Sequence, residues 1–174
     1  MPAKPRVFVA RRIPAVGLDL IAPQCDAEVW PDLLPPPASV LREKVRDVPD
    51  FPHAGIVFKD LMPLIADRMA FRETIDLLAD WAGPRQPDVI LGAEARGFIF
   101  GGALAYVLGC GFVPARKPGK LPWETIDATY ELEYGTDTLE VHADAIGRGA
   151  RVIVLDDVLA TGGTAKAKVE LVER

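Results

Sequence analysis

The feature that most constrains the fold is a buried-type strand that runs directly into two carboxylates and a glycine turn. Residues 152–155 read Val-Ile-Val-Leu, the acid pair Asp156 and Asp157 follows, and the loop then reaches Gly162 and Gly163. A short apolar run rich in β-branched residues is typical of a parallel sheet that is covered on both faces. In such sheets, ligands bind beyond the carboxyl ends of the strands. This segment therefore predicts an α/β fold with a binding site at one edge of the sheet.

Apolar strands alternate with helical patterns through most of the chain, as a parallel α/β sheet requires. Between Phe71 and Trp81, large apolar residues recur at three- and four-residue steps, which indicates an amphipathic helix. We expect further helices at residues 38–46, 98–108 and 164–174, strands at 89–91 and 112–115, and a hairpin that pairs 129–133 with 138–141.

The loop after the acid pair has the composition of a phosphate-binding loop. Its glycines let the backbone approach a ligand closely, and the amides that open the following helix favour an anion. The acid pair is suited to accept hydrogen bonds from sugar hydroxyls or to hold a cation. Neither a Walker ending nor the Gly-x-Gly-x-x-Gly dinucleotide fingerprint occurs. The predicted phosphate contacts are Ala160, Thr161, Gly162, Gly163 and Thr164.

Composition excludes several classes of protein. The chain has 174 residues, 49% of them hydrophobic, and a net charge of -5. This length suits about one domain. The net negative charge gives no excess of basic residues to attract nucleic acid or an anionic membrane. The apolar content is too high for a disordered chain, and no apolar run approaches the ~20 residues that span a bilayer. We expect a cytoplasmic globular protein with no nucleic-acid or membrane partner.

Six motifs occur together from about residue 45 onward. They lie at residues 47–52, 55–60, 94–98, 116–122, 130–135 and 156–164. In their order and spacing they resemble the adenine phosphoribosyltransferase family. The resemblance implies a type I phosphoribosyltransferase fold, a parallel sheet flanked by helices. It also implies that adenine displaces pyrophosphate from 5-phosphoribosyl pyrophosphate to give AMP. Magnesium carried by the substrate and a homodimer are implied as well.

The same resemblance assigns roles to individual residues. Glu133 matches the residue that transfers a proton near the base, and Asp156 and Asp157 match those at the ribose and its magnesium. The implied pyrophosphate contacts are Arg96, Arg116, Lys117 and Lys120, and the implied adenine contacts are Val57, Phe58, Lys59, Val158 and Tyr134.

Residues 1–44 do not match that family. They resemble the opening of D-2-hydroxyacid dehydrogenases of the glycerate/hydroxypyruvate reductase type, through Arg-Val-Phe-Val at 6–9 and Glu-Val-Trp-Pro at 28–31. We expect a βαβ-like segment with strands at 7–9 and 27–30 and a helix at 16–21. Our interpretation is a hybrid, natural or engineered, of this segment and a transferase-like domain at 45–174 that lacks the family's C-terminal part. The strand at 7–9, or a partner chain, is expected to take the place of the missing strand.

Three alternatives to a working transferase stay open. The same fold can hold phosphoribosyl pyrophosphate or AMP as a sensor without turnover, although Glu133 and the basic residues at 116–120 favour the enzyme. A structured but inactive hybrid is the second alternative. A dehydrogenase is the weakest, because the chain has no dinucleotide loop.

Overall fold

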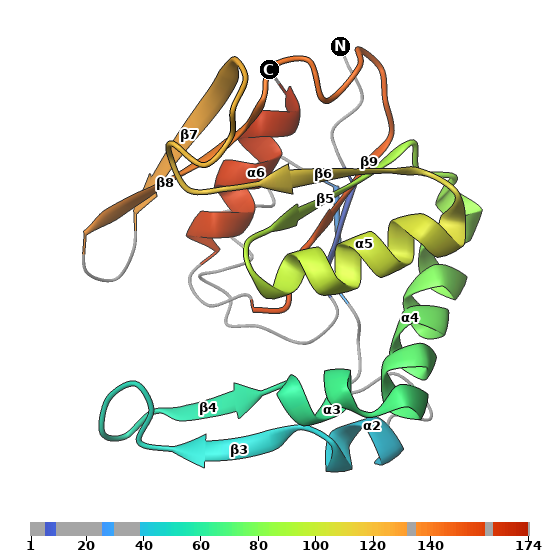
Figure 1. Ribbon diagram of the computed structural model, residues 1–174, viewed down its shortest axis with the longest axis vertical. Coiled ribbons are helices and arrows are strands. Elements are labelled where there is room, and N and C mark those ends of the chain that lie inside the picture. The colour runs from blue at the N-terminus through green and yellow to red at the C-terminus, as the bar shows by residue number, and fades with distance from the viewer. Residues whose placement is uncertain (1–5, 10–25, 30–38, 132–134, 159–161, 174) are drawn as a thin grey trace.

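The computed structural model describes residues 6–9, 26–29, 39–131, 135–158 and 162–173 (Figure 1). At its centre is a three-stranded parallel sheet in the order β6-β5-β9. The strands are β5 (Val89–Ala93), β6 (Gly111–Ala115) and β9 (Val152–Leu155), and the main helices are α4 (Arg68–Ala82), α5 (Arg96–Leu108) and α6 (Gly163–Glu173). The α/β fold predicted from the sequence is confirmed.

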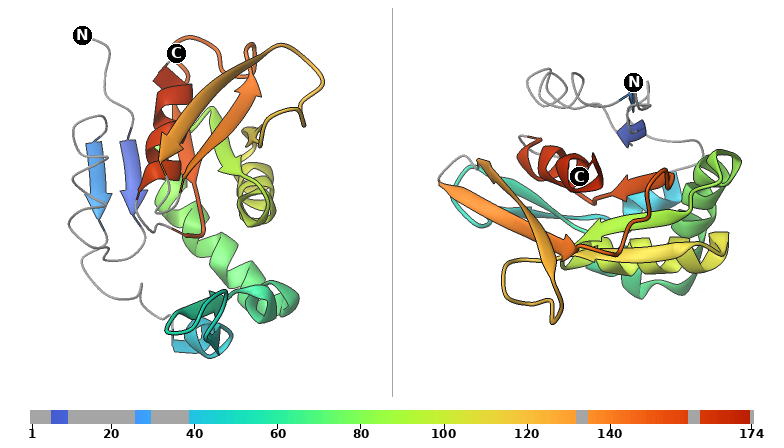
Figure 2. Two further views of the ribbon diagram at one scale, coloured as in Figure 1. Left: turned by 90° about the vertical axis from the view of Figure 1, so that its left-hand side faces the viewer. Right: turned by 90° about the horizontal axis from the view of Figure 1, so that it is seen from above.

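The sheet separates two apolar cores because side chains alternate between its faces along each strand. Ile90, Ile153 and Leu155 belong to the core that contains α4 and α5. Leu91 and Val113 belong to the core on the other face, which α6 covers. Figure 2 shows α5 and α6 on opposite sides of the sheet. Both faces are therefore covered, as the continuous apolar strands predict.

The helices begin and end close to the expected positions for local reasons. Asp67 caps α4, because its carboxylate accepts hydrogen bonds from the amides of Met69 and Ala70. The helix α5 ends at Gly109, whose φ of +67° is a left-handed conformation that suits glycine. None of the helices in the described ranges has both the length and the apolarity needed to cross a bilayer.

Two antiparallel hairpins extend from this layered core. The first pairs β7 (Thr125–Glu131) with β8 (Thr136–His142) and packs against α6, which confirms the predicted hairpin over residues 129–131. β7 begins four residues earlier than predicted, and residues 132–133 lie outside the described residues. The second pairs β3 (Arg46–Pro49) with β4 (Val57–Asp60) and was not expected.

The helix predicted at 38–46 is accordingly shorter, since α2 (Ser39–Glu43) stops where β3 begins to pair. Ion pairs between Arg46 and Asp60 and between Lys59 and Asp47 also connect the two strands. The remaining elements between this hairpin and β5 are α3 (Met62–Ala66) and the 3-10 turn η1 (Gly83–Arg85).

The N-terminal segment forms a separate pair of strands. β1 (Arg6–Val9) runs parallel to β2 (Asp26–Val29), which confirms both predicted strands, while the helix expected at 16–21 lies outside the described residues. β1 lies beside β9, but among the described residues its hydrogen-bond ladder joins it to β2 and not to the central sheet. The expectation that residues 7–9 extend that sheet is therefore wrong.

Candidate active site

The carboxyl ends of the three parallel strands place the predicted polar residues along one edge of the sheet. Glu94 and Arg96 follow β5, Arg116 follows β6, and the acid pair Asp156 and Asp157 follows β9. Parallel pairing brings these three strand ends side by side. A loop-rich edge of this kind is where open α/β sheets bind ligands.

Each carboxylate of the acid pair bonds a different cation. Asp157 accepts a hydrogen bond from Nε of Arg96, and its side chain is only 8% exposed. Asp156 accepts one from Nζ of Lys168, which lies on α6 and has a side chain with no exposed surface. The pair was predicted to hold a sugar or a cation, and in this structure its partners are two side-chain cations.

The phosphate-binding loop is described in part. Gly162 adopts a φ of +88°, and its carbonyl accepts a hydrogen bond from the amide of Lys166 as α6 begins. Gly163 and Thr164 form the first turn of the helix, where amides without helical partners point outward. The predicted contacts Ala160 and Thr161 lie outside the described residues. The described part has the backbone arrangement that favours a bound anion.

Tyr130 on β7 connects this helix start to the hairpin. Its hydroxyl donates to Asp137 at 3.4 Å, and the side chain of Thr164 lies close enough to lower the pKa of Tyr130. Burial raises the pKa of Tyr130, and the contact with Thr164 opposes that shift without cancelling it. Asp137 in turn pairs with Lys117 at 3.0 Å. A chain of polar contacts therefore runs from the phosphate loop to the basic residues.

Those basic residues form a loop at 116–120, which we call the basic loop, and Glu94 holds it. The Glu94 carboxylate accepts from the backbone amide of Lys117 at 2.7 Å, from Nζ of Lys120 at 3.0 Å and from Arg116 at 3.3 Å. Burial would raise the pKa of Glu94, but these donors outweigh it and lower the pKa below its ordinary value. Glu94 is thus a carboxylate clamp on three of the predicted pyrophosphate contacts.

The β3–β4 hairpin brings an apolar surface to the same region. The ring of Phe58 lies 5.7 Å from the guanidinium carbon of Arg96 and packs edge-on against Phe51. Val57 and Val158 are about half exposed, at 52% and 49%, so neither is a core residue. The Lys59 side chain pairs with Asp47 across the hairpin. Val57 and Phe58 on the hairpin offer an apolar surface on which a flat ring can lie.

Like Ala160 and Thr161, the predicted residues Glu133 and Tyr134 lie outside the described residues. Two others were missed as site residues: Glu94, quoted only as part of a motif, and Lys168. A lysine three positions after the buried Ala165 and one before the buried Val169 interrupts the apolar face of the helix. That interruption is the signal in the sequence that identifies Lys168.

The described residues contain no group of three or more histidine, cysteine or acidic side chains arranged to hold a metal ion. The acid pair is already neutralised by Arg96 and Lys168. Mg²⁺ is ordinarily bound through one or two carboxylates together with substrate phosphates and water. Asp156 and Asp157 are the carboxylates at this edge that could contribute to such a site.

Comparison with known proteins identifies a matching family and similar relatives. Residues 67–174 match the family model described as phosphoribosyl transferase domain. Adenine phosphoribosyltransferase from Thermotoga neapolitana is 55% identical over 134 residues, which is 77% of this chain and 79% of that protein.

Two solved structures have the same fold over most of the chain. The adenine phosphoribosyltransferase of Thermoanaerobacter pseudethanolicus is 54% identical, with a TM-score of 0.74 over 77% of this chain and 78% of the other. The Saccharomyces cerevisiae enzyme is 45% identical, with a TM-score of 0.75 over 78% and 80%, and was solved with an imino-altritol bisphosphate and adenine.

Proposed function

The chain belongs to the adenine phosphoribosyltransferases of the phosphoribosyl transferase family, and we propose which part of the reaction each of its site residues serves. The enzyme is a transferase of purine salvage that forms AMP and pyrophosphate from adenine and 5-phosphoribosyl pyrophosphate. The observation that carries the proposed division is the position of the acid pair, the helix α6 and the basic loop at one edge of the sheet.

The phosphoribosyl group is held by two elements at the end of β9. The loop at 160–164 binds the 5-phosphate through backbone amides and the hydroxyls of its threonines. Asp156 and Asp157 bind the ribose hydroxyls. Each carboxylate oxygen can accept more than one hydrogen bond, so the bonds to Lys168 and Arg96 leave acceptor capacity for a diol. These contacts fix the anomeric carbon in place for attack by adenine.

The leaving pyrophosphate is neutralised by the cations beside β5 and β6. Arg96, Arg116, Lys117 and Lys120 are its proposed partners, since placement and charge neutralisation are what such a leaving group requires. Magnesium enters the proposal with the substrate, where it supplies further positive charge to the pyrophosphate oxygens.

Adenine is proposed to lie against Val57, Phe58 and Val158, with backbone groups near Lys59 at its edge and Tyr134 covering it. The exposure of Val57 and Val158 supports this position, because an apolar side chain at a site edge gains by covering a flat ring. Glu133 exchanges a proton with the purine as the bond to the ribose forms.

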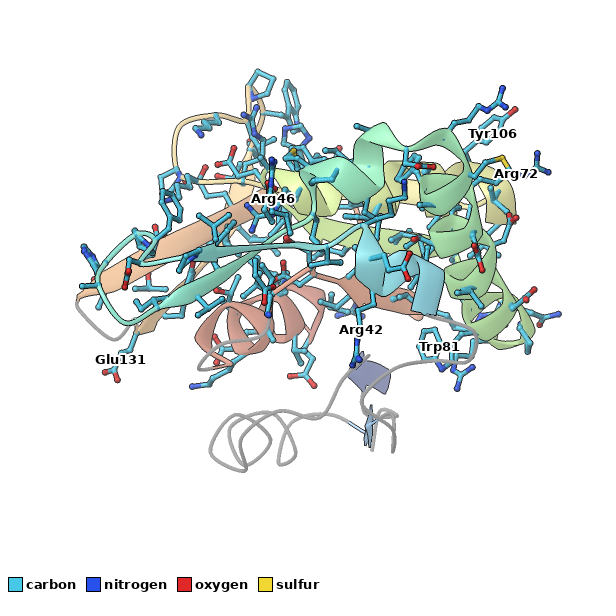
Figure 3. All side chains as sticks on the ribbon, turned by 90° about the horizontal axis from the view of Figure 1, so that it is seen from below. Arg42, Arg46, Arg72, Trp81, Tyr106 and Glu131 are labelled. Carbon is cyan, nitrogen blue, oxygen red and sulfur yellow. The ribbon has the colours of Figure 1, made fainter. Side chains whose placement is uncertain are left out.

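The decisive experiment compares Glu133→Gln with a neighbouring control. With adenine, phosphoribosyl pyrophosphate and magnesium, the wild-type protein forms AMP. Glu133→Gln is expected to lower kcat by at least about 100-fold, because general acid–base catalysis contributes about 10²–10⁴-fold. Binding of phosphoribosyl pyrophosphate is expected to stay close to wild type. Glu131→Gln is the control, since Glu131 is exposed and projects outward from the end of the hairpin (Figure 3).

Three outcomes contradict this proposal. Equal losses in turnover and in substrate binding would contradict the proton-transfer role of Glu133. Binding of the substrate by the wild-type protein without any AMP would instead favour the sensor, and the absence of both binding and turnover would favour the inactive hybrid.

We also propose that the enzyme is a homodimer and that it works in the cytoplasm. Residues 1–44 form a dehydrogenase-like segment distinct from the transferase domain at 45–174. The separate β1–β2 pair supports that division.

A further inference from the structure

Lys168 is the most unusual charged residue among those the structure describes. It lies on α6, its side chain has no exposed surface, and its neighbours Ala167 and Val169 are also buried. Lysine is almost never fully buried unless it is paired, because an ammonium group loses its hydration in an apolar interior. Such a residue requires an account of what its charge does.

The partner of Lys168 is the first carboxylate of the acid pair. Its Nζ donates to Oδ2 of Asp156, while Oδ1 of Asp156 accepts from the amide of Asp157 at 3.0 Å. Both oxygens of Asp156 are thus held, and its side chain keeps 21% of its surface exposed. Burial lowers the pKa of Lys168, and the charge of Asp156 opposes that shift.

The second carboxylate is held from the opposite side. Arg96, at the start of α5, bonds Asp157, and α5 and α6 cover opposite faces of the sheet. Two cations therefore bracket the acid pair. Arg96 is 35% exposed and is a proposed pyrophosphate contact. The Lys168 side chain is fully buried, so it cannot contact a substrate directly.

We propose that Lys168 is a positioning residue for phosphoribosyl transfer, whose buried ammonium group fixes the Asp156 carboxylate in the orientation that binds the ribose hydroxyls. This inference rests on the ribose role proposed for Asp156. It predicts that loss of the ammonium group weakens binding of phosphoribosyl pyrophosphate, while adenine binding and the chemical step change much less. A purely structural link between β9 and α6 would change stability without separating KM from kcat in this way.

The test is a double-mutant cycle between Lys168→Met and Asp156→Asn, with steady-state kinetics and thermal melts for each variant. Lys168→Met is expected to raise KM for phosphoribosyl pyrophosphate about tenfold or more, in line with loss of a hydrogen bond to a charged group, with kcat within about threefold of wild type. Lys166→Met is the matched control. Lys166 lies on the same helix, is 41% exposed and faces Glu170 at 3.6 Å, so its loss should leave KM unchanged.

The double variant makes the result independent of whether Lys168→Met folds, because it removes both charges together. Its KM for phosphoribosyl pyrophosphate should equal that of Asp156→Asn alone, since Lys168 acts only through Asp156. A further loss in the double variant, or a wild-type KM in a folded Lys168→Met, would overturn the inference. An unchanged KM in Asp156→Asn alone would instead refute the ribose role on which it rests.

Discussion

Gly92 lies near the end of β5 and touches the backbone at the start of α5, next to Arg96. A methyl group at position 92 would lie 2.7 Å from the carbonyl oxygen of Gly97 and 3.1 Å from Cε2 of Phe112. The first contact is with backbone, so no side-chain rotation relieves it. Gly92→Ala must therefore displace either β5 or the start of α5, and with it the Arg96 guanidinium that bonds Asp157.

The expected cost has a structural and a catalytic part. Forcing one methyl group into a packed interior costs about 1–3 kcal/mol. For a chain of this size each kcal/mol lowers the melting temperature by about 2–4 °C, so the expected fall is roughly 2–12 °C. If the start of α5 is displaced by a fraction of an ångström to one ångström, kcat/KM for phosphoribosyl pyrophosphate should fall by about 10–100-fold.

Calorimetry and AMP formation under saturating adenine measure the two parts. Gly102→Ala is the control, since a methyl group there meets no atom within 4 Å and the position lies inside α5. Alanine is favoured over glycine in a helix by about 0.5–1 kcal/mol, so this variant should be as stable as wild type or slightly more so, with full activity. Wild-type melting and kinetics in Gly92→Ala would refute the close-contact argument.

Two further predictions concern the hairpin and the helix cap. Tyr130→Phe removes the hydroxyl that contacts Thr164 and Asp137, so KM for phosphoribosyl pyrophosphate should rise about tenfold; an unchanged KM would separate Tyr130 from the phosphate loop. Asp67 has a pKa lowered to about 2 by Lys44 and by the amides of Ala70 and Met69. Its charge stabilises the fold above the unfolded pKa of about 3.9, and this contribution is lost as the pH falls toward 2. Thermal melts should therefore show a steeper loss between pH 4 and pH 2 in wild type than in Asp67→Asn, and equal slopes would contradict this role.

The central layer could be predicted from local sequence because its signals are local. The apolar strands β5 and β9 and the periodic helix α4 contain the pattern that folds them. The β3–β4 hairpin was missed because its strands lack apolar alternation. The backbone ladder that pairs them, and the ion pairs from Arg46 to Asp60 and from Lys59 to Asp47, join residues 14 and 12 positions apart.

The predicted site residues were located more easily than their partners. Motifs identified Arg96 and the acid pair, but the contact of Arg96 with Asp157 joins residues 61 positions apart and depends on the order of strands in the sheet. The Glu94 contacts with the basic loop likewise span more than 20 positions. Partners of this kind follow from the assembled fold, so single-sequence reasoning does not reach them.

The Glu94 clamp bears on how product leaves the enzyme. Lys120 holds onto Glu94 with a side chain that is still 46% exposed, and such half-solvated ion pairs are weak. In the proposed reaction Lys120 exchanges the Glu94 carboxylate for an oxygen of pyrophosphate, rather than moving between water and an anion. When pyrophosphate leaves, Lys120 forms its ion pair with Glu94 again, so tight binding of the leaving group need not slow its release.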